Sequence, residues 1–346
     1  MKMKIKIGNR IISESSKPLI VAEIGINHFG SLKLAKKIVD KIKLSKAEAV
    51  KVQIHIPDEE MSEECKYIKP GNSNLSIYEV IKKNSLTLDE ELKLKNYIKK
   101  KKLIYIATPF SFMAAKWLNE NNVDIFKIGS GECNCLPLVR YVASFKKPMI
   151  VSTGMNSLDN VNNTYKILKK NKIKHVLMHC VNLYPTSFKL SRINRLKKMF
   201  ERFDESLIGY SDHTVGTDIC KIAISLGAAV IEKHFTFDKK INGPDISCSM
   251  NANDLEELMR FSNIYYESLK SKKEIIKEED VTRRFAFHSV VTKKDIKKGT
   301  FLSDKNLTVK RPGTGSFPAN KLSTLFGKKA RRDLNANILI GSKDVT

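Results

Sequence analysis

Short apolar segments rich in Val and Ile alternate with longer amphipathic segments between residues 18 and 235. Each apolar segment has the length of a strand that is buried on both faces, and each amphipathic segment has the periodicity of a helix. Strands that alternate with helices predict parallel β/α units. The expected strands are 18–25, 49–55, 103–109, 125–131, 148–154, 175–182, 207–213 and 228–235.

Eight β/α units of this combined length match a (β/α)8 TIM barrel, which typically takes about 250 residues. The segments 31–45, 88–101 and 160–171 show the pattern expected of the intervening helices. A doubly wound open sheet is the alternative, but no glycine-rich dinucleotide-binding motif follows the first expected strand. The sequence therefore predicts the α/β class, with residues 1–269 forming the barrel.

The C-terminal part of the chain has a different pattern. Residues 270–284 are highly charged and are expected to form a linker. Residues 285–346 combine short apolar segments with Gly and Pro turns, which predicts a small β-rich domain. Within it, residues 293–307 resemble residues 331–345 in their order of charged residues, apolar residues and turn.

The chain carries a formal net charge of +25, which raises the hypothesis of nucleic-acid binding. The lysines, however, lie mostly in helical segments such as "LKLKNYIKKKK", without interleaved aromatic residues or a recognition motif. We therefore interpret them as solvated helix faces and expect no nucleic-acid partner. The positive charge would still attract a small anionic substrate.

Membrane insertion and secretion are not expected either. No apolar run reaches the ~20 residues of a membrane span, and Glu23 interrupts the first apolar segment, unlike a signal peptide. The six cysteines form no Cys-x-x-Cys pair, so neither a zinc knuckle nor a redox motif is indicated. We expect a cytoplasmic protein with reduced thiols.

Polar side chains occur at the carboxyl end of nearly every expected strand. In a TIM barrel these ends converge on one face, where active sites are built. The sequence therefore predicts one polar pocket formed by Glu23, Gln53, His55, Thr108, Lys127, Ser130, Glu132, Ser152, Asn182, Ser211, His213, Glu232 and His234.

Two histidines occupy matched positions on neighbouring strands. His213 follows the seventh strand and His234 ends the eighth, with the carboxylates Asp212, Glu232 and Asp245 nearby in the sequence. Two imidazoles that leave positions open for water and substrate suit a divalent cation acting as a Lewis acid. The alternative is two unconnected histidines, each satisfied by hydrogen bonds. We favour the metal site.

Lys127 lies within an apolar strand, in "FKIGSGE". It could form a Schiff base, which requires a lowered pKa, or remain charged and bind an anion, or extend to the rim. The turn at residues 129–131 offers backbone N–H groups and a hydroxyl to an anion. The neighbouring polar residues that favour anion binding are Ser130, Ser152, Asn182 and Ser211.

Glu23 ends the first strand and could act as a general acid or base. Its alternative role is that of a partner for Lys51 or Lys127. Gln53 and Asn72 suit a polyhydroxylated substrate but are equally compatible with ordinary turns.

Several motifs together resemble those of bacterial N-acetylneuraminate (sialic acid) synthases. They include "AEIGINHFGSLKLAKKIVD", "KVQIH", "PGNSNLSIYE", "FKIGSGECN", "NLYPT", "YSDHT", "EKHFT", "GPDISCSM" and "VKRPGTG", and they span nearly the whole chain. The resemblance implies a TIM barrel followed by an antifreeze-like (SAF) domain. It also implies condensation of phosphoenolpyruvate with N-acetylmannosamine and water, giving N-acetylneuraminate and phosphate by C–O cleavage.

The resemblance further implies a divalent metal, typically Mn²⁺ with Mg²⁺ or Co²⁺ as alternatives. It implies a domain-swapped homodimer in which each SAF domain covers the partner's barrel. The product would enter a capsule or a lipooligosaccharide.

The family's residue roles carry over to matching positions. The metal ligands fall on His213 and His234, and the acid/base carboxylate falls on Glu23. The phosphoenolpyruvate-binding residues fall on Thr108, Lys127, Ser130, Ser152, Asn182 and Ser211. The sugar-binding residues fall on Gln53, Asn72, Tyr184, Asp245 and, from the other chain, Arg311. We add Lys51, Glu132 and Glu232 to the expected substrate-binding residues and regard Glu23, Lys127 and His234 as catalytic.

One position departs from the family pattern, because Phe29 replaces a small polar residue in "INHFG". Sister families make legionaminate or pseudaminate by the same reaction, and "GNSNLSIYE" and "NLYPT" favour the N-acetylneuraminate branch. Two other hypotheses remain: a Schiff-base aldolase that uses Lys127, and a polyanion-binding protein with an inactive barrel. For Arg311, an ordinary surface role is the alternative.

Overall fold

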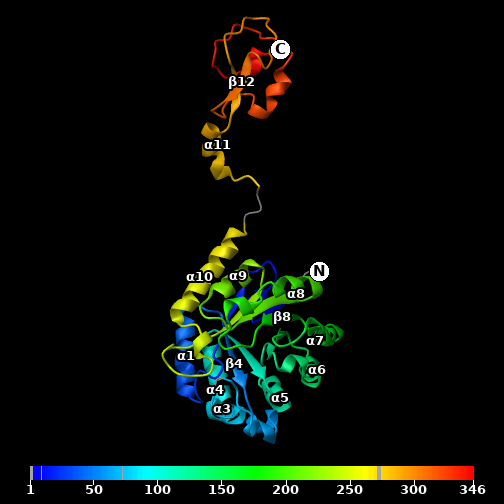
Figure 1. The fold of residues 1–346 in the computed structure, drawn as a ribbon, viewed down its shortest axis with the longest axis vertical. Coiled ribbons are helices and arrows are strands. Elements are labelled where there is room, and N and C mark those ends of the chain that lie inside the picture. The colour runs from blue at the N-terminus through cyan, green and yellow to red at the C-terminus, as the bar shows by residue number, and fades with distance from the viewer. Residues whose placement is uncertain (1–2, 9, 72, 271–273) are drawn as a thin grey trace. The chain divides into compact units, whose positions relative to one another are not determined.

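The computed structural model describes residues 3–8, 10–71, 73–270 and 274–346. Its contacts divide the chain into two compact units, Met1–Lys270 and Ser271–Thr346, each of which can be followed in Figure 1. Each unit has its own hydrophobic core.

The first unit contains a closed barrel of eight parallel strands within the described residues, in the order β10-β3-β4-β5-β6-β7-β8-β9. The strands are β3 (Leu19–Glu23), β4 (Ala49–Ile54), β5 (Ile104–Pro109), β6 (Phe126–Ile128), β7 (Met149–Ser152), β8 (His175–Cys180), β9 (Leu207–Asp212) and β10 (Val230–His234). The last strand closes the barrel by pairing with the first, so that His234 lies opposite Glu23. The predicted (β/α)8 barrel is confirmed.

Helices cover the outside of the barrel (Figure 1). They are α1 (Leu32–Leu44), α4 (Leu88–Lys100), α5 (Phe112–Glu120), α6 (Leu136–Ser144), α7 (Leu158–Lys170), α8 (Arg195–Arg202), α9 (Asp218–Ser225) and α10 (Ala252–Ser268). Two shorter helices, α2 (Pro57–Glu60) and α3 (Ile77–Asn84), lie in the connection between β4 and α4. Side-chain caps fix several helix starts, as at Ser31 and at the Thr87 capping box.

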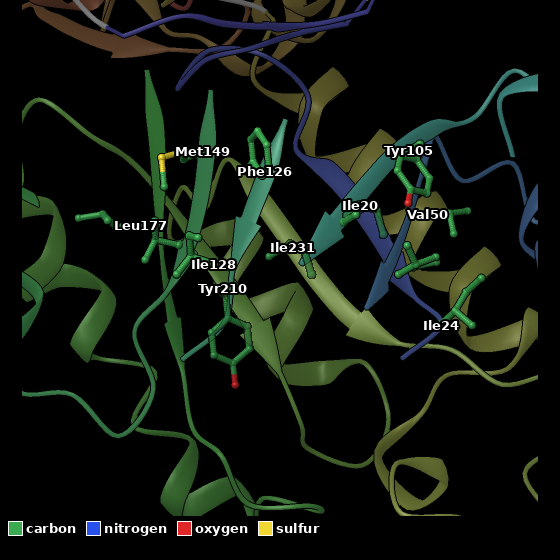
Figure 2. Close-up of a cluster of buried hydrophobic side chains, with 14 of the residues drawn as sticks. Ile20, Ile24, Val50, Tyr105, Phe126, Ile128, Met149, Leu177, Tyr210 and Ile231 are labelled. Carbon is green, nitrogen blue, oxygen red and sulfur yellow. The ribbon is translucent and has the colours of Figure 1, made fainter. Parts of the chain in front are cut away.

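The main core fills the space between the strands and these helices. Outward-facing strand residues such as Ile20, Val50 and Ile231 are buried there (Figure 2). Because successive strand residues point to opposite faces, the residues between them point into the barrel. This alternation makes the outer face mostly apolar, with Asp212 and Lys233 as charged exceptions, and directs polar groups near the carboxyl ends of the strands into the barrel.

An N-terminal hairpin, β1 (Ile5–Ile7) and β2 (Arg10–Ile12), was not predicted. Ile5, Ile7 and Ile12 are fully or almost fully buried in a cluster with the first residues of the barrel strands, such as Leu19 and Val230. The hairpin therefore packs against the amino end of the barrel interior. The alternation in "IKIGNRII", with Gly-Asn at its centre, was the available signal.

The second unit is small and poor in regular structure. Its strands β11 (Ser289–Thr292) and β12 (Leu307–Lys310) pair antiparallel. Ile296 and Leu334, which occupy corresponding positions of the two similar segments, exchange backbone hydrogen bonds of 2.8 Å in both directions. The expected linker includes residues 271–273, which lie outside the described residues, and the start of helix α11 (Asp280–Ala286).

None of the helices in the described part of the chain is long and apolar enough to cross a membrane.

Candidate active site

Lys127 forms the centre of a cluster of buried charged residues at the carboxyl end of the barrel. It lies on the short strand β6, and only 1% of it is exposed. Its Nζ donates a 2.6 Å hydrogen bond to Ser152 Oγ on β7 and lies 3.5 Å from Glu232 Oε1 on β10. The buried ammonium is therefore balanced by a carboxylate from across the barrel.

Lys51 on β4 supplies a second ammonium group. Its Nζ lies 2.9 Å from Glu23 Oε2, donates to Thr108 Oγ1 at 3.2 Å, and lies 3.8 Å from Glu232 Oε1. Burial lowers the pKa of Lys51 from 10.5 to about 8. Two lysines from different strands thus face the same carboxylate.

Glu232 connects these two lysines and also accepts a 3.1 Å hydrogen bond from Ser211 Oγ. Burial raises the pKa of Glu232, but the ammonium groups of Lys127 and Lys51 outweigh burial and lower it to about 2. The carboxylate is therefore ionised. An incoming anion would compete with Glu232 for both lysines.

A cavity of about 200 Å³ opens above this cluster. Most of the sequence-predicted site residues line it, namely Lys51, Gln53, Thr108, Lys127, Ser130, Glu132, Ser152, Asn182, Tyr184, Ser211, His213, Glu232 and His234. The absence of a side chain at Gly154 leaves room for the side chains of Asn182 and Ser130 in the cavity wall. A Cβ at this position would collide with the Asn182 amide and crowd the Ser130 hydroxyl. Burial raises the pKa of Glu132.

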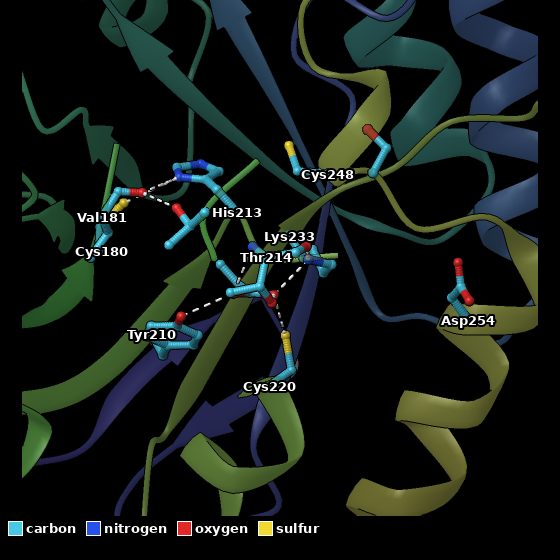
Figure 3. Close-up of polar contacts among 12 residues, drawn as sticks. Cys180, Val181, Tyr210, His213, Thr214, Cys220, Lys233, Cys248 and Asp254 are labelled. Atoms are coloured by element: carbon cyan, nitrogen blue, oxygen red, sulfur yellow. Dashed lines mark hydrogen bonds and ion pairs between the residues drawn. The ribbon is translucent and has the colours of Figure 1, made fainter. Parts of the chain in front are cut away.

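The two predicted metal ligands lie side by side at the rim of the cavity. The ring centroids of His213 and His234 are 5.4 Å apart. His213 Nδ1 makes a 2.7 Å hydrogen bond to the Val181 carbonyl, shown in Figure 3. Nδ1 therefore carries the proton, and the lone pair of Nε2 is available to a metal.

His234 presents a buried Nδ1 that has no hydrogen-bond partner among the described residues. Burial, together with the Lys51 ammonium, lowers the pKa of His234 to about 3, so that the imidazole is neutral. Asp245 Oδ2 lies 3.6 Å from this nitrogen, which is too long for a hydrogen bond. The neutral His234 imidazole with its orphaned nitrogen, beside the His213 ring with its Nε2 free of the Val181 contact, fits an open divalent-cation site.

Two of the three carboxylates expected near the metal lie elsewhere, whereas Asp245 Oδ2 is 3.6 Å from His234 Nδ1. Asp212 points out of the barrel and pairs with Lys233, and Glu232 pairs with the lysines. No cluster of three or more His, Cys, Asp or Glu residues suited to a metal is found in the described ranges. Water or substrate would therefore have to supply the remaining ligands of a cation bound by His213 and His234.

A wider outer cavity of about 570 Å³ adjoins the inner one and shares Gln53, Asn182 and Tyr184 with it. The Tyr184 ring lies 4.1 Å from the His213 ring, measured between centroids. Gln53 Oε1 lies 3.0 Å from His55 Nε2. Most of the lining is apolar, including Ile77, Val80, Ile81 and Pro70 of the connection after β4.

The remaining predicted site residues lie outside the inner cavity. Glu23 is buried beside Lys51, and Asp245 lines the outer cavity. Asn72 lies outside the described residues. Arg311 belongs to the second unit, where its Nε donates to the Ala286 carbonyl at 3.1 Å.

Sequence reasoning missed two residues that line the site, Phe110 and Cys180. Phe110 stacks on His55 with ring centroids 4.2 Å apart. Cys180 ends strand β8, so the rule that strand ends face the pocket could have identified it.

Phe29 adopts a positive φ of 50°, and its ring closely approaches Gly243.

A closed parallel barrel with buried lysines, carboxylates and histidines at the carboxyl ends of its strands defines a TIM-barrel protein whose polar pocket lies where this fold builds its active sites. Residues 38–274 match the NeuB family and residues 287–346 match the SAF domain. The chain belongs to the NeuB family. The family membership and the C-terminal SAF domain that the sequence resemblance implied are therefore confirmed.

Named relatives cover nearly the whole chain. N,N'-diacetyllegionaminic acid synthase from Campylobacter jejuni is 35% identical over 94% of this chain and 99% of its own length. Pseudaminic acid synthase from Helicobacter pylori is 31% identical over 95% of this chain and 98% of its own length. The crystal structure of N-acetylneuraminic acid synthetase from Leptospira borgpetersenii, in complex with citrate, gives a TM-score of 0.74 at 30% identity over 82% of this chain and 95% of that one.

Proposed function

We propose that this protein is an N-acetylneuraminate synthase, which condenses phosphoenolpyruvate with N-acetylmannosamine and water to give N-acetylneuraminate and phosphate. The observation that carries the proposal is the pair of buried lysines, Lys51 and Lys127, beside two neighbouring imidazoles, His213 and His234, at one end of the barrel. Named relatives that make sialic, legionaminic and pseudaminic acids support this reaction class.

In the proposed reaction, Lys127 and Lys51 bind the carboxylate and phosphate of phosphoenolpyruvate in place of Glu232. Hydroxyl groups that already contact these lysines, from Ser152 and Thr108, complete the polar wall. Charge-assisted hydrogen bonds of this kind are strong when they are shielded from water. The enol carbon of phosphoenolpyruvate is thereby held facing the rim.

The aldehyde of the open-chain sugar would lie beside His213 and His234. His213 and His234 would hold a divalent cation, which we propose to be Mn²⁺ and which would supply Lewis-acid polarisation of the aldehyde. Tyr184, whose ring lies against His213, limits the position of the sugar on one side. Gln53 and Asp245, which line the outer cavity, would contact the hydroxyl and N-acetyl groups.

The bond changes balance as follows. The enol carbon forms a C–C bond to the aldehyde carbon, and the aldehyde oxygen gains a proton. Water adds to the resulting oxocarbenium carbon and loses a proton. The bond between that carbon and the phosphate oxygen then breaks, and its electron pair leaves with the phosphate. The hydroxyl that came from water loses its proton and becomes the keto oxygen of the product. We assign to Glu23, which lies 2.9 Å from Lys51, the transfer of protons between water and the sugar oxygen.

We further propose a domain-swapped homodimer, in which Arg311 of each chain contacts the sugar bound to the other. The small size of the second unit supports this arrangement, because domains of this size have modest cores.

The second candidate is the same reaction with a 2,4-diacetamido-trideoxyhexose. The relative named N,N'-diacetyllegionaminic acid synthase supports it, as does the apolar lining of the outer cavity. A sugar with fewer hydroxyl groups than N-acetylmannosamine would leave fewer of them without a hydrogen-bond partner against this apolar lining.

Phosphate release from phosphoenolpyruvate tests the proposal. We expect release that depends on N-acetylmannosamine and on Mn²⁺, is abolished by EDTA and is restored by Mn²⁺. Faster release with a diacetamido-trideoxyhexose would select the second candidate. If neither sugar gave phosphate release, the proposal would be contradicted. A pyruvate adduct at Lys127 trapped by borohydride would also contradict it.

A further inference from the structure

Two charged residues in the motifs "YSDHT" and "EKHFT" have no place in the mechanism above. Asp212 and Lys233 are 0% and 1% exposed, and they lie directly opposite each other on β9 and β10. Strand alternation points them away from the cavity, between the barrel and its helices. They therefore cannot contact a substrate.

These two residues form a compact buried network with Tyr210 and Thr214; Figure 3 labels Lys233, Tyr210 and Thr214. Lys233 Nζ lies 2.5 Å from Asp212 Oδ2 and donates to the Thr214 carbonyl at 2.6 Å. Asp212 Oδ1 accepts hydrogen bonds from the Thr214 backbone N–H at 3.1 Å and from Tyr210 Oη at 2.9 Å. Asp212 Oδ2 also accepts from Thr214 Oγ1 at 3.0 Å.

The network holds the backbone on both sides of His213. Strand β9 ends at Asp212, and its ladder with β10 ends at the Asp212–Lys233 pair, so that His213 is the first residue beyond regular pairing. Thr214, the next residue, is bound through its N–H, hydroxyl and carbonyl. Lys233 itself directly precedes His234.

We propose that Asp212 and Lys233 are positioning residues, which hold His213 and His234 at the spacing needed to share one divalent cation. A buried ion pair adds little to stability compared with apolar side chains of similar volume, so stability alone does not account for it. Outer partners that orient metal ligands change metal affinity strongly. This inference rests on the metal site of the proposed function.

The double variant Asp212→Leu/Lys233→Met separates positioning from stability. It removes both charges together, so that no buried charge is left unpaired. We expect a folded protein whose Mn²⁺ affinity is about 10- to 100-fold weaker, the effect typical of losing outer-sphere partners. Binding is measured on the full chain by Mn²⁺ electron paramagnetic resonance. Phosphoenolpyruvate affinity without metal should change less than about twofold, because Lys51 and Lys127 lie on other strands.

Two further variants keep the test decisive. Thr214→Val removes only the hydroxyl contact with Asp212 and should weaken Mn²⁺ binding less than the double variant does. Glu91→Gln is the control, because Glu91 is a buried carboxyl on α4 whose pKa is raised to about 8 by burial. Glutamine imitates its neutral form, so Mn²⁺ affinity should stay unchanged.

Unchanged Mn²⁺ affinity in the folded double variant would overturn the positioning role and leave the proposed function intact. If the double variant does not fold, unchanged affinity in Thr214→Val would overturn it in the same way. Absence of Mn²⁺ binding by the wild-type protein would overturn both the metal-dependent function and this inference.

Discussion

At the scale of single residues, the chemistry of the site depends on a few charged side chains that lie close together in a buried space. Lys51 and Lys127 both face Glu232, and burial makes each charge dependent on the others. Lys51, Lys127 and Glu232 were all among the site residues expected from the sequence. The sequence could not predict their pairing, which arises only when β4, β6 and β10 close into a barrel.

Lys127→Met tests whether Lys127 binds an anion or acts as a nucleophile. We expect kcat/KM for phosphoenolpyruvate to fall at least about 100-fold, because the substitution removes a charge-assisted contact that contributes about 3 kcal/mol. Lys169→Met, which alters an exposed lysine, is the control. Wild-type protein incubated with pyruvate and borohydride should gain no mass. A mass increase lost in Lys127→Met would instead identify a Schiff base.

The pKa of Lys51 predicts a pH dependence. Because burial lowers this pKa to about 8, Lys51 is charged below pH 8 and becomes neutral above it. The logarithm of kcat/KM for phosphoenolpyruvate should therefore decline as pH rises through about 8. Lys51→Arg, which stays charged over this range, should lack that decline. A wild-type profile that is flat between pH 7 and 9.5 would contradict the assignment.

At the scale of elements, alternation of apolar and amphipathic segments was sufficient to predict the barrel strands. Strand lengths were less accurate: the expected strand 125–131 is only Phe126–Ile128 in the structure. The Gly129-Ser130-Gly131 turn leaves the sheet there to line the cavity. The hairpin β1–β2 was not predicted, although isoleucines alternate with charged residues on both sides of its Gly-Asn sequence.

The hairpin should contribute to stability and not to substrate binding. Ile7 is 1% exposed against the amino end of the barrel, whereas Ile11 of the same hairpin is 52% exposed. Ile7→Ala should lower the free energy of unfolding by about 2–5 kcal/mol, and Ile11→Ala by less than about 0.5 kcal/mol. Urea denaturation measures both. Equal effects, or a changed KM in Ile7→Ala, would contradict this role.

At the scale of the whole molecule, the central question is whether the second unit completes the site of another chain. Sequence similarity predicted this arrangement for Arg311, and the structure describes Arg311 only within its own unit. Contacts between chains leave no periodic signal in a single sequence, so they had to be inferred from the family.

Arg311→Ala should raise the KM for the sugar much more than the KM for phosphoenolpyruvate, with Arg331→Ala as the control.

Subunit mixing tests directly whether Arg311 acts on the site of the other chain. Lys127→Met and Arg311→Ala homodimers, each impaired, should regain activity when mixed, because one site of the mixed dimer is intact if Arg311 acts on the other chain. No gain on mixing would place Arg311 in its own chain's site, or in none.

The central claim is that the lysine cluster and the histidine pair together perform a condensation with C–O cleavage. The most direct measurement is phosphorus-31 NMR of the phosphate released in ¹⁸O-labelled water, with Mn²⁺ and with or without N-acetylmannosamine or a diacetamido-trideoxyhexose. The account predicts phosphate that carries no ¹⁸O and appears only when a sugar is present. Labelled phosphate, or phosphate released without any sugar, would contradict it.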